Sequence, residues 1–164
     1  MLNKINFLFV TLFGIGKIKK VPGSFASLAT TLFLFFLFHI LNIFPNIILF
    51  FVIIIFFISL YSVNIFIKNL DNKDPKEVVI DEFVGQSIPI CLYEIAHDGP
   101  KETDQVLISY FIMFILFRIF DIVKPYPANF YDKNFKNSFG VIMDDICAGL
   151  YVVAVLVLYM VINS

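Results

Sequence analysis

Residues 21–67 decide the fold, because VPGSFASLATTLFLFFLFHILNIFPNIILFFVIIIFFISLYSVNIFI contains no Lys, Arg, Asp or Glu. The run is more than twice the roughly 20 residues that one helix needs to cross the hydrocarbon core of a bilayer. Asn42, Pro45 and Asn46 interrupt it near its middle and mark a turn. The run therefore predicts two transmembrane helices, near residues 25–41 and 47–67.

The composition of the whole chain agrees with a membrane protein. Of its 164 residues, 60% are hydrophobic and 15% are charged, whereas soluble domains have roughly 45–50% and about 25%. The mean hydropathy is +0.90. A net charge of −1 gives no overall attraction to polyanions, which argues against a nucleic-acid partner. We therefore expect one membrane-embedded domain over residues 1–164, with an all-α fold.

Three further segments extend this to a polytopic membrane helical bundle of four to five transmembrane helices. Residues 146–164 carry no charge, and residues 105–120 carry only Arg118. Residues 79–96 are the ambiguous segment, because they contain two adjacent acids, a glutamine, a proline and Glu94; they could also form a tilted or re-entrant helix. Residues 2–13 are too short to span and could lie in the membrane interface.

The distribution of lysines favours five crossings. Lys4 and the lysines at 17, 19 and 20 precede the first crossing, so the N-terminus is expected to be cytoplasmic. Lys68, Lys73 and Lys76 then return to that side. If residues 79–96 span the membrane, the lysines at 124, 133 and 136 are also inside, and the loop 97–104 is outside.

Two pairs of adjacent acids are the first candidate site. Asp81-Glu82 and Asp144-Asp145 are each expected to open an apolar helix, where ionised carboxylates are costly and usually functional. Their mutual repulsion would be relieved by a divalent cation, and hard oxygen ligands suit Mg²⁺. Gly85 and Gly149 each follow an acid by four residues, so they could let the two helices approach closely. The alternative is that acids simply favour helix N-termini.

Arg118, Asp121 and Lys124 form a second candidate, because a spacing of three residues places them on one helix face. The guanidinium fork and the ammonium group are both suited to phosphate oxygens. The alternative is an ion pair within the helix, with the lysine reaching to the interface.

A third candidate precedes the first long helix. Three lysines at 17, 19 and 20 lead into Pro22 and Gly23, followed by Ser24 as the expected N-cap. Free N–H groups at a helix start next to lysines form a ready anion site. The alternative is an ordinary helix cap with cytoplasmic lysines. His39 and His97 are expected to lie outside any site.

Clustered acids together with basic groups at a membrane surface suit a metal ion and a phosphorylated lipid. A small cation transporter would need its carboxylates near the bilayer midplane, and a non-catalytic scaffold would need no metal. Another phospholipid-metabolising enzyme is the nearest alternative among enzymes, although the D-G-x₂-A-R motif of the lipid-synthesising transferases is absent.

Several blocks in order resemble bacterial phosphatidylglycerophosphatase A: FGIG at 13–16, VPGSFAS at 21–27, DEFVG at 81–85, FRIFD at 117–121 with KPYP at 124–127, and GVIMDDICAG at 140–149. The resemblance implies a Mg²⁺-dependent phosphatase of the bacterial inner membrane. It implies hydrolysis of phosphatidylglycerophosphate in the bilayer to phosphatidylglycerol and orthophosphate, with the site on the cytoplasmic side.

Residue types suggest the role of each side chain. The expected Mg²⁺ ligands are Asp81, Glu82, Asp144 and Asp145. The expected catalytic residues are Asp81, Asp121 and Asp145, where Asp121 completes the metal shell or positions water. The expected substrate-binding residues are Lys20, Gly23, Ser24, Arg118 and Lys124.

Overall fold

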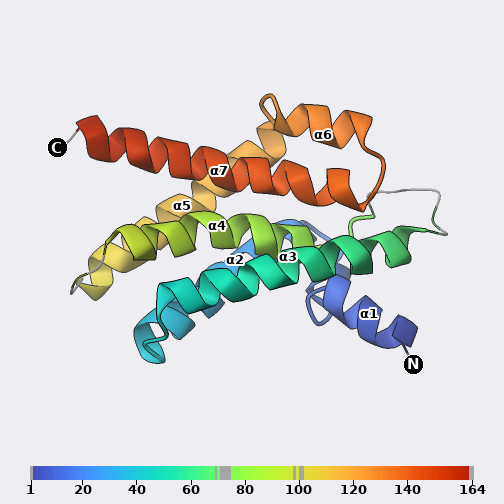
Figure 1. The fold of residues 1–164 in the computed structure, drawn as a ribbon, viewed down its shortest axis with the longest axis horizontal. Helices are drawn as coiled ribbons and strands as arrows, with labels where there is room; N and C mark the ends of the chain where they lie inside the picture. The colour runs from blue at the N-terminus through green and yellow to red at the C-terminus, as the bar shows by residue number, and fades with distance from the viewer. Residues whose placement is uncertain (1, 69, 71–74, 98, 100–101, 163–164) are drawn as a thin grey trace.

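The computed structural model describes residues 2–68, 70, 75–97, 99 and 102–162, and within these ranges the regular structure is entirely helical. The elements are α1 (Leu2–Val10), η1 (Ile15–Lys17), α2 (Pro22–Phe35), η2 (Phe36–Ile40), α3 (Pro45–Ile67), α4 (Ile80–Ala96), α5 (Thr103–Val123), α6 (Ala128–Asn134) and α7 (Ser138–Ile162). The all-α helical bundle is confirmed (Figure 1). Lys73 and most of the tip of the expected outer loop, at 98, 100 and 101, lie outside the described residues.

Four helices are long and apolar enough to cross a membrane: α2 with η2 (Pro22–Ile40), α3, α5 and α7. The chain is therefore a membrane protein. The expected turn between the first two is present, since Asn42 adopts a left-handed φ of 52° and Pro45 begins α3. Pro at the first position of a helix needs no hydrogen-bond partner for its nitrogen and already has the helical φ.

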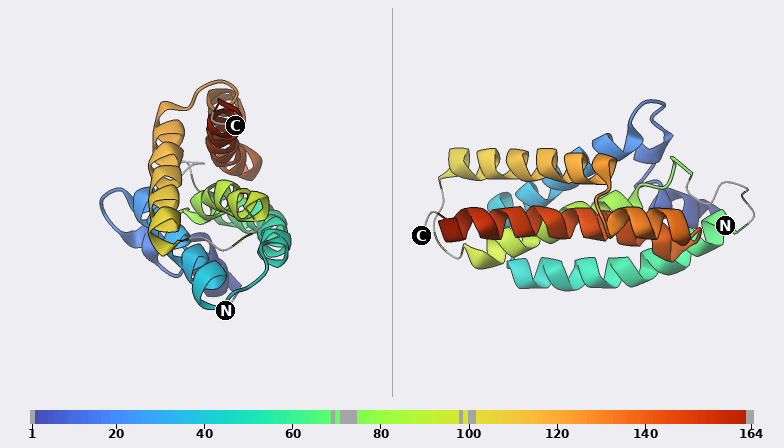
Figure 2. Two further views of the ribbon diagram at one scale, coloured as in Figure 1. Left: turned by 90° about the vertical axis from the view of Figure 1, so that its left-hand side faces the viewer. Right: turned by 90° about the horizontal axis from the view of Figure 1, so that it is seen from above.

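The ambiguous segment forms α4, the central helix of the bundle (Figure 2). Eleven of its 17 residues are buried, and it packs against α2, α3, α5 and α7. Its polar side chains face neighbouring helices instead of lipid, which explains why its sequence is less apolar than that of a span. The long helices alternate in direction along the bundle, and α4 runs parallel to α7 (Figure 1). A fifth membrane crossing by α4 stays a prediction.

Two glycines bring α4 and α7 into backbone contact. A Cβ atom added to Gly85 would lie 2.5 Å from the carbonyl oxygen of Asp145, and one added to Gly149 would overlap the carbonyl oxygen of Gly85. Neither position has room for a side chain. The expectation that these glycines allow a close helix approach is confirmed, and the approach places the two acid pairs side by side.

Two expected helix starts are wrong. Asp144 and Asp145 do not open α7, because it begins at Ser138, where Gly140 N donates to Asn137 Oδ1 at 3.1 Å and the asparagine caps the helix. Ser24 is not an N-cap, because α2 begins at Pro22 after Val21, whose left-handed φ of 47° turns the chain into the helix.

Replacing Gly85 by alanine tests the helix contact. The added methyl group would meet backbone atoms of α7, which cannot move aside as a side-chain tip can. We expect Gly85→Ala to lower the free energy of unfolding by roughly 1–3 kcal/mol, measured by thermal or denaturant unfolding in detergent. Gly99→Ala is the matched control, because an added Cβ there meets nothing within 4 Å. Equal stability of the two variants would contradict the backbone contact.

Candidate functional site

One cavity of about 360 Å³ gathers the charged residues at the end of the bundle where α2, α4 and α7 begin and α5 ends. Its lining residues come from these four helix ends and from the segments that precede α2 and α4: Lys19, Val21, Pro22, Gly23, Ser24, Lys76, Val78, Asp81, Glu82, Arg118, Asp121, Ile122, Lys124, Val141, Asp144 and Asp145. Segments far apart in the sequence therefore build a single polar site at one end of apolar helices.

Three carboxylates form the core of this cavity. Oxygen atoms of Asp81, Glu82 and Asp145 all lie within 4.8 Å of one another. Asp81 is 7% exposed and Asp145 is 4% exposed. Within the described residues, the buried Oε2 atom of Glu82 has no hydrogen-bond partner. Three close carboxylates, two of them buried and one partly buried, form a donor set that fits a hard divalent cation such as Mg²⁺.

Asp144 is not part of this group of three, and it pairs with Lys124. The Lys124 ammonium donates to Asp144 Oδ2 and, at 2.9 Å, to Asp132 Oδ1 on α6. Burial lowers the pKa of Lys124, but its hydrogen bonds to Asp144 and Asp132 outweigh this and raise that pKa above the ordinary range. The lysine therefore stays charged and holds α5, α6 and α7 together beside the acids.

Arg118 connects α5 to both α2 and the acidic core. Its Nη2 lies 3.0 Å from Asp121 Oδ2, and its Nη1 donates to Ser27 Oγ at 3.2 Å. The Ser27 hydroxyl in turn donates to the carbonyl oxygen of Gly23 at 2.9 Å. The carboxyl group of Asp121 also lies within hydrogen-bonding reach of Asp145. Asp121 thus lies between the guanidinium and the carboxylate core.

Gly23 lets α2 approach these charges. A Cβ atom there would overlap Glu82 Oε1 and would lie 3.4 Å from Arg118 Nη1. Only a glycine at this position leaves the glutamate and the arginine where they are.

All the predicted site residues line the cavity except Lys20, which is exposed and lies outside the lining. Lys19 lines the cavity in place of Lys20. Lys76 also lines the cavity. Two contacts hold the segment that follows it: Gly16 packs directly on the Glu77 backbone, and Val79 N donates to Val10 O at 3.0 Å. From the sequence, Lys76 was expected only to lie on the cytoplasmic side, and it was not expected in the site. Asp132, which pairs with Lys124 from α6, was missed altogether, since no pattern links the two residues.

The two histidines lie outside this cavity, as expected. His39 Nε2 is 3.3 Å from Glu94 Oε1, and Tyr110 OH donates to the same oxygen at 3.0 Å. His97 Nδ1 lies 3.0 Å from the Tyr93 carbonyl oxygen. These groups belong to the opposite end of α4, where they pair with one another.

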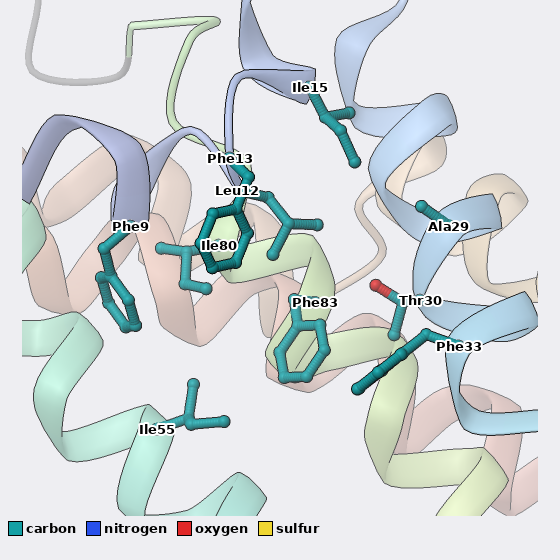
Figure 3. A pocket seen from close by; sticks show the side chains of 10 residues that line it. All are labelled: Phe9, Leu12, Phe13, Ile15, Ala29, Thr30, Phe33, Ile55, Ile80 and Phe83. Carbon is teal, nitrogen blue, oxygen red and sulfur yellow. The ribbon is translucent and has the colours of Figure 1, made fainter. Parts of the chain in front are cut away.

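A larger cavity of about 560 Å³ lies on the other side of the first turn of α4, between α1, α2 and α3 (Figure 3). It is lined by Phe9, Leu12, Phe13, Ile15, Ala29, Thr30, Phe33, Ile55, Ile80 and Phe83. Its one hydroxyl, that of Thr30, donates to the Ala26 carbonyl oxygen at 2.8 Å. This cavity offers no charged group to a phosphate, so the smaller acidic cavity is the candidate site.

Comparison with known proteins assigns the chain to a family. The family model for Phosphatidylglycerophosphatase A matches residues 8–160. The chain belongs to this family. A phosphatidylglycerophosphatase A of Haemophilus influenzae is 34% identical over 155 residues, which cover 94% of this chain and 88% of the relative. The phosphatidylglycerophosphatase A of Escherichia coli is 29% identical over 139 residues, covering 84% and 73%. The predicted family and the predicted enzyme class, a phosphatase, are confirmed.

A third relative, from Bacteroides thetaiotaomicron, carries the provisional name phosphatidylinositol-3-phosphatase. It is 42% identical over 79 residues, which cover 48% of this chain and 45% of the relative. No solved structure matches the chain. The names of these three relatives therefore differ in the lipid head group.

Gly23→Ala tests the contact between α2 and the acids. The methyl group would displace the flexible end of Glu82 without meeting a rigid backbone, so we expect the free energy of unfolding to change by less than about 1 kcal/mol. Displacing a ligand by about 1 Å should lower hydrolysis of a lipid phosphomonoester roughly 10- to 100-fold. Both quantities are measured on purified protein, with Gly99→Ala as control. Full activity in Gly23→Ala would show that the position of Glu82 is not critical.

Proposed function

We propose that the chain hydrolyses the terminal phosphomonoester of phosphatidylglycerophosphate to phosphatidylglycerol and orthophosphate, with Mg²⁺, as a step of phospholipid biosynthesis. The observation that carries this proposal is the meeting of three close carboxylates with Arg118 and Lys124 in one cavity at the end of apolar helices. Metal-assisted chemistry on a phosphate needs both kinds of charge, and the phosphorylated head group of a lipid lies at the membrane surface, where the helices end. Family membership supports the choice of head group.

Asp81, Glu82 and Asp145 would hold the metal ion. When bound, Mg²⁺ would polarise phosphate oxygens and ease the deprotonation of water. Asp144, although next to Asp145, is engaged with Lys124, so its proposed role is to position that lysine.

The basic residues would bind and orient the substrate phosphate. Arg118 presents a fork of donors, and its ion pair with Asp121 fixes the direction of that fork. Lys124 lies on the same side of the cavity, and Lys19 and Lys76 add positive charge to its lining. These groups would balance the charge that develops on the phosphate oxygens in the transition state.

The reaction consumes one water molecule. The water oxygen forms a bond to phosphorus while the ester P–O bond breaks, and the departing glycerol oxygen gains a proton. Asp121 lies beside both Arg118 and Asp145, so it is placed to accept the proton of the attacking water. The products are phosphatidylglycerol and orthophosphate.

The cytoplasmic face of the bacterial inner membrane is the proposed location of the site. Lys19, Lys20 and Lys76 lie beside or within the lining of the acidic cavity, and positive charge is enriched on cytoplasmic loops. A cation transporter is less well supported, because the clustered carboxylates lie at one end of the bundle and not near its middle.

Removing either the metal or a carboxylate should abolish activity. Purified protein in detergent should release phosphate from phosphatidylglycerophosphate with Mg²⁺ and lose this activity with a chelator. Asp81→Asn and Asp145→Asn should reduce the rate at least about 100-fold, while thermal stability holds or rises because like charges no longer repel. Glu94→Gln, a buried acid at the far end of α4, is the control. Near-normal rates in both Asp variants would overturn the metal site, and faster hydrolysis of phosphatidylinositol 3-phosphate would overturn the head-group assignment.

Arg118→Lys separates phosphate binding from a structural ion pair. Lysine keeps the charge but loses the fork, so kcat/KM should fall roughly 10- to 100-fold, a loss of about 1.4–2.8 kcal/mol. Asp121→Asn should cost at least as much, because Asp121 also contacts Asp145. A purely structural pair would instead lower thermal stability and leave kcat/KM of the folded enzyme unchanged.

A further inference from the structure

Buried polar atoms without partners cluster beside the acidic cavity. In the part of the chain that the structure describes, the buried side-chain atoms that lack a hydrogen-bond partner are Ser59 Oγ, Glu82 Oε2, Gln86 Nε2, Gln86 Oε1 and Arg118 Nε. Ser59 is on α3, and the other four atoms belong to only three residues. Two of these, Glu82 and Arg118, line the cavity. An unpaired buried polar atom destabilises the fold, so the presence of four such atoms on three neighbouring residues calls for an explanation.

Gln86 lies one helical turn from Glu82 on the same face of α4. It is fully buried, at 0% exposure. Residues four apart on a helix are neighbours, and helical side chains lean toward the N-terminus. We therefore expect the side chain of Gln86 to lean back toward Glu82.

The neighbouring helices place Arg118 at the same level along the bundle as Gln86. α2 and α4 both begin at the cavity end (Figure 2) and touch where Gly23 meets Glu82. One turn further along both helices come Ser27 and Gln86, and Ser27 Oγ accepts the hydrogen bond from Arg118 Nη1. Helix register therefore places Gln86 at the level of Arg118, one turn beyond Glu82, although no direct hydrogen bond joins the unpartnered atoms of these three residues.

We propose that Gln86 is a positioning residue for the metal site, an inference that rests on the proposed function. One bridging water would link its amide N–H to Oε2 of Glu82, and another would link its amide oxygen to Nε of Arg118, since no direct hydrogen bond joins these atoms in the structure. A carboxamide is the neutral side chain that offers both a donor and an acceptor. It fixes one carboxylate oxygen of Glu82, so that the other is aimed at the metal, and links that orientation to the phosphate-binding arginine.

The test measures metal binding separately from catalysis. Gln86→Met keeps the length of the side chain and removes both polar groups. We expect a somewhat lower thermal stability without metal, because Glu82 and Arg118 lose the groups that the amide links. We also expect the Mg²⁺ concentration for half-maximal thermal stabilisation to rise roughly 10- to 100-fold. The same shift should appear in the Mg²⁺ concentration for half-maximal activity.

Ser59→Ala is the matched control, because it removes another fully buried, unpartnered polar atom from a different helix. It should leave the Mg²⁺ dependence at the wild-type value. Gln86→Asn keeps the carboxamide but withdraws it by one carbon, and it should also weaken Mg²⁺ stabilisation, which covers the case that the Met variant does not fold.

Each result decides between the hypotheses. Wild-type Mg²⁺ dependence in Gln86→Met or Gln86→Asn, or an equal shift in Ser59→Ala, overturns the role of Gln86 alone. Absence of any Mg²⁺ stabilisation in the wild type overturns the metal site and this role with it. Mg²⁺ stabilisation without release of phosphate from phosphatidylglycerophosphate overturns the proposed reaction and leaves the role of Gln86 intact.

Discussion

The backbone contact between Gly85 on α4 and Gly149 on α7 is the constraint on which the site depends. Asp81 lies four residues before Gly85, and Asp145 lies four residues before Gly149, so the contact fixes how far apart the two carboxylates are. Any side chain at either glycine would separate the helices. The fold therefore holds like charges together in a buried place, where their repulsion is strong. Tight packing elsewhere along α4 must supply the stability that this arrangement removes.

The positive residues are arranged so that they do not neutralise the core. Lys124 is engaged by Asp144 and Asp132, and Arg118 is engaged by Asp121. These pairs leave Asp81, Glu82 and Asp145 as a separate carboxylate group. If both cations contacted those three acids, there would be less reason for a metal ion to bind. Pairing each cation with its own acid keeps both a negative and a positive surface within one cavity.

Much of this arrangement can be predicted from the sequence, for identifiable reasons. Apolar runs predict α2, α3, α5 and α7 because lipid-facing helices must be apolar throughout. Adjacent acids at the expected starts of two helices predict the carboxylate core. The start of α7 was misplaced because the cap is Asn137, which precedes the acids that seemed to mark the boundary. Lys19 was missed in favour of Lys20 because the choice depends on the left-handed turn at Val21.

The packing of α4 explains why residues 79–96 were ambiguous in the sequence and why the candidate site lies at one end of this helix. α4 carries acidic residues near both ends, Glu82 at its start and Glu94 near its end, and the sequence alone does not show which end is the functional one. At the far end, Glu94 accepts from Tyr110 and lies beside His39, so its charge is met by neighbouring side chains. At the near end, Glu82 keeps an unpartnered oxygen beside two further carboxylates. A buried acid that is fully paired stabilises the bundle, whereas acids left unpaired and close together favour a ligand from outside the chain. The degree of hydrogen-bond satisfaction, which only the assembled helices determine, distinguishes the structural end of α4 from the reactive one.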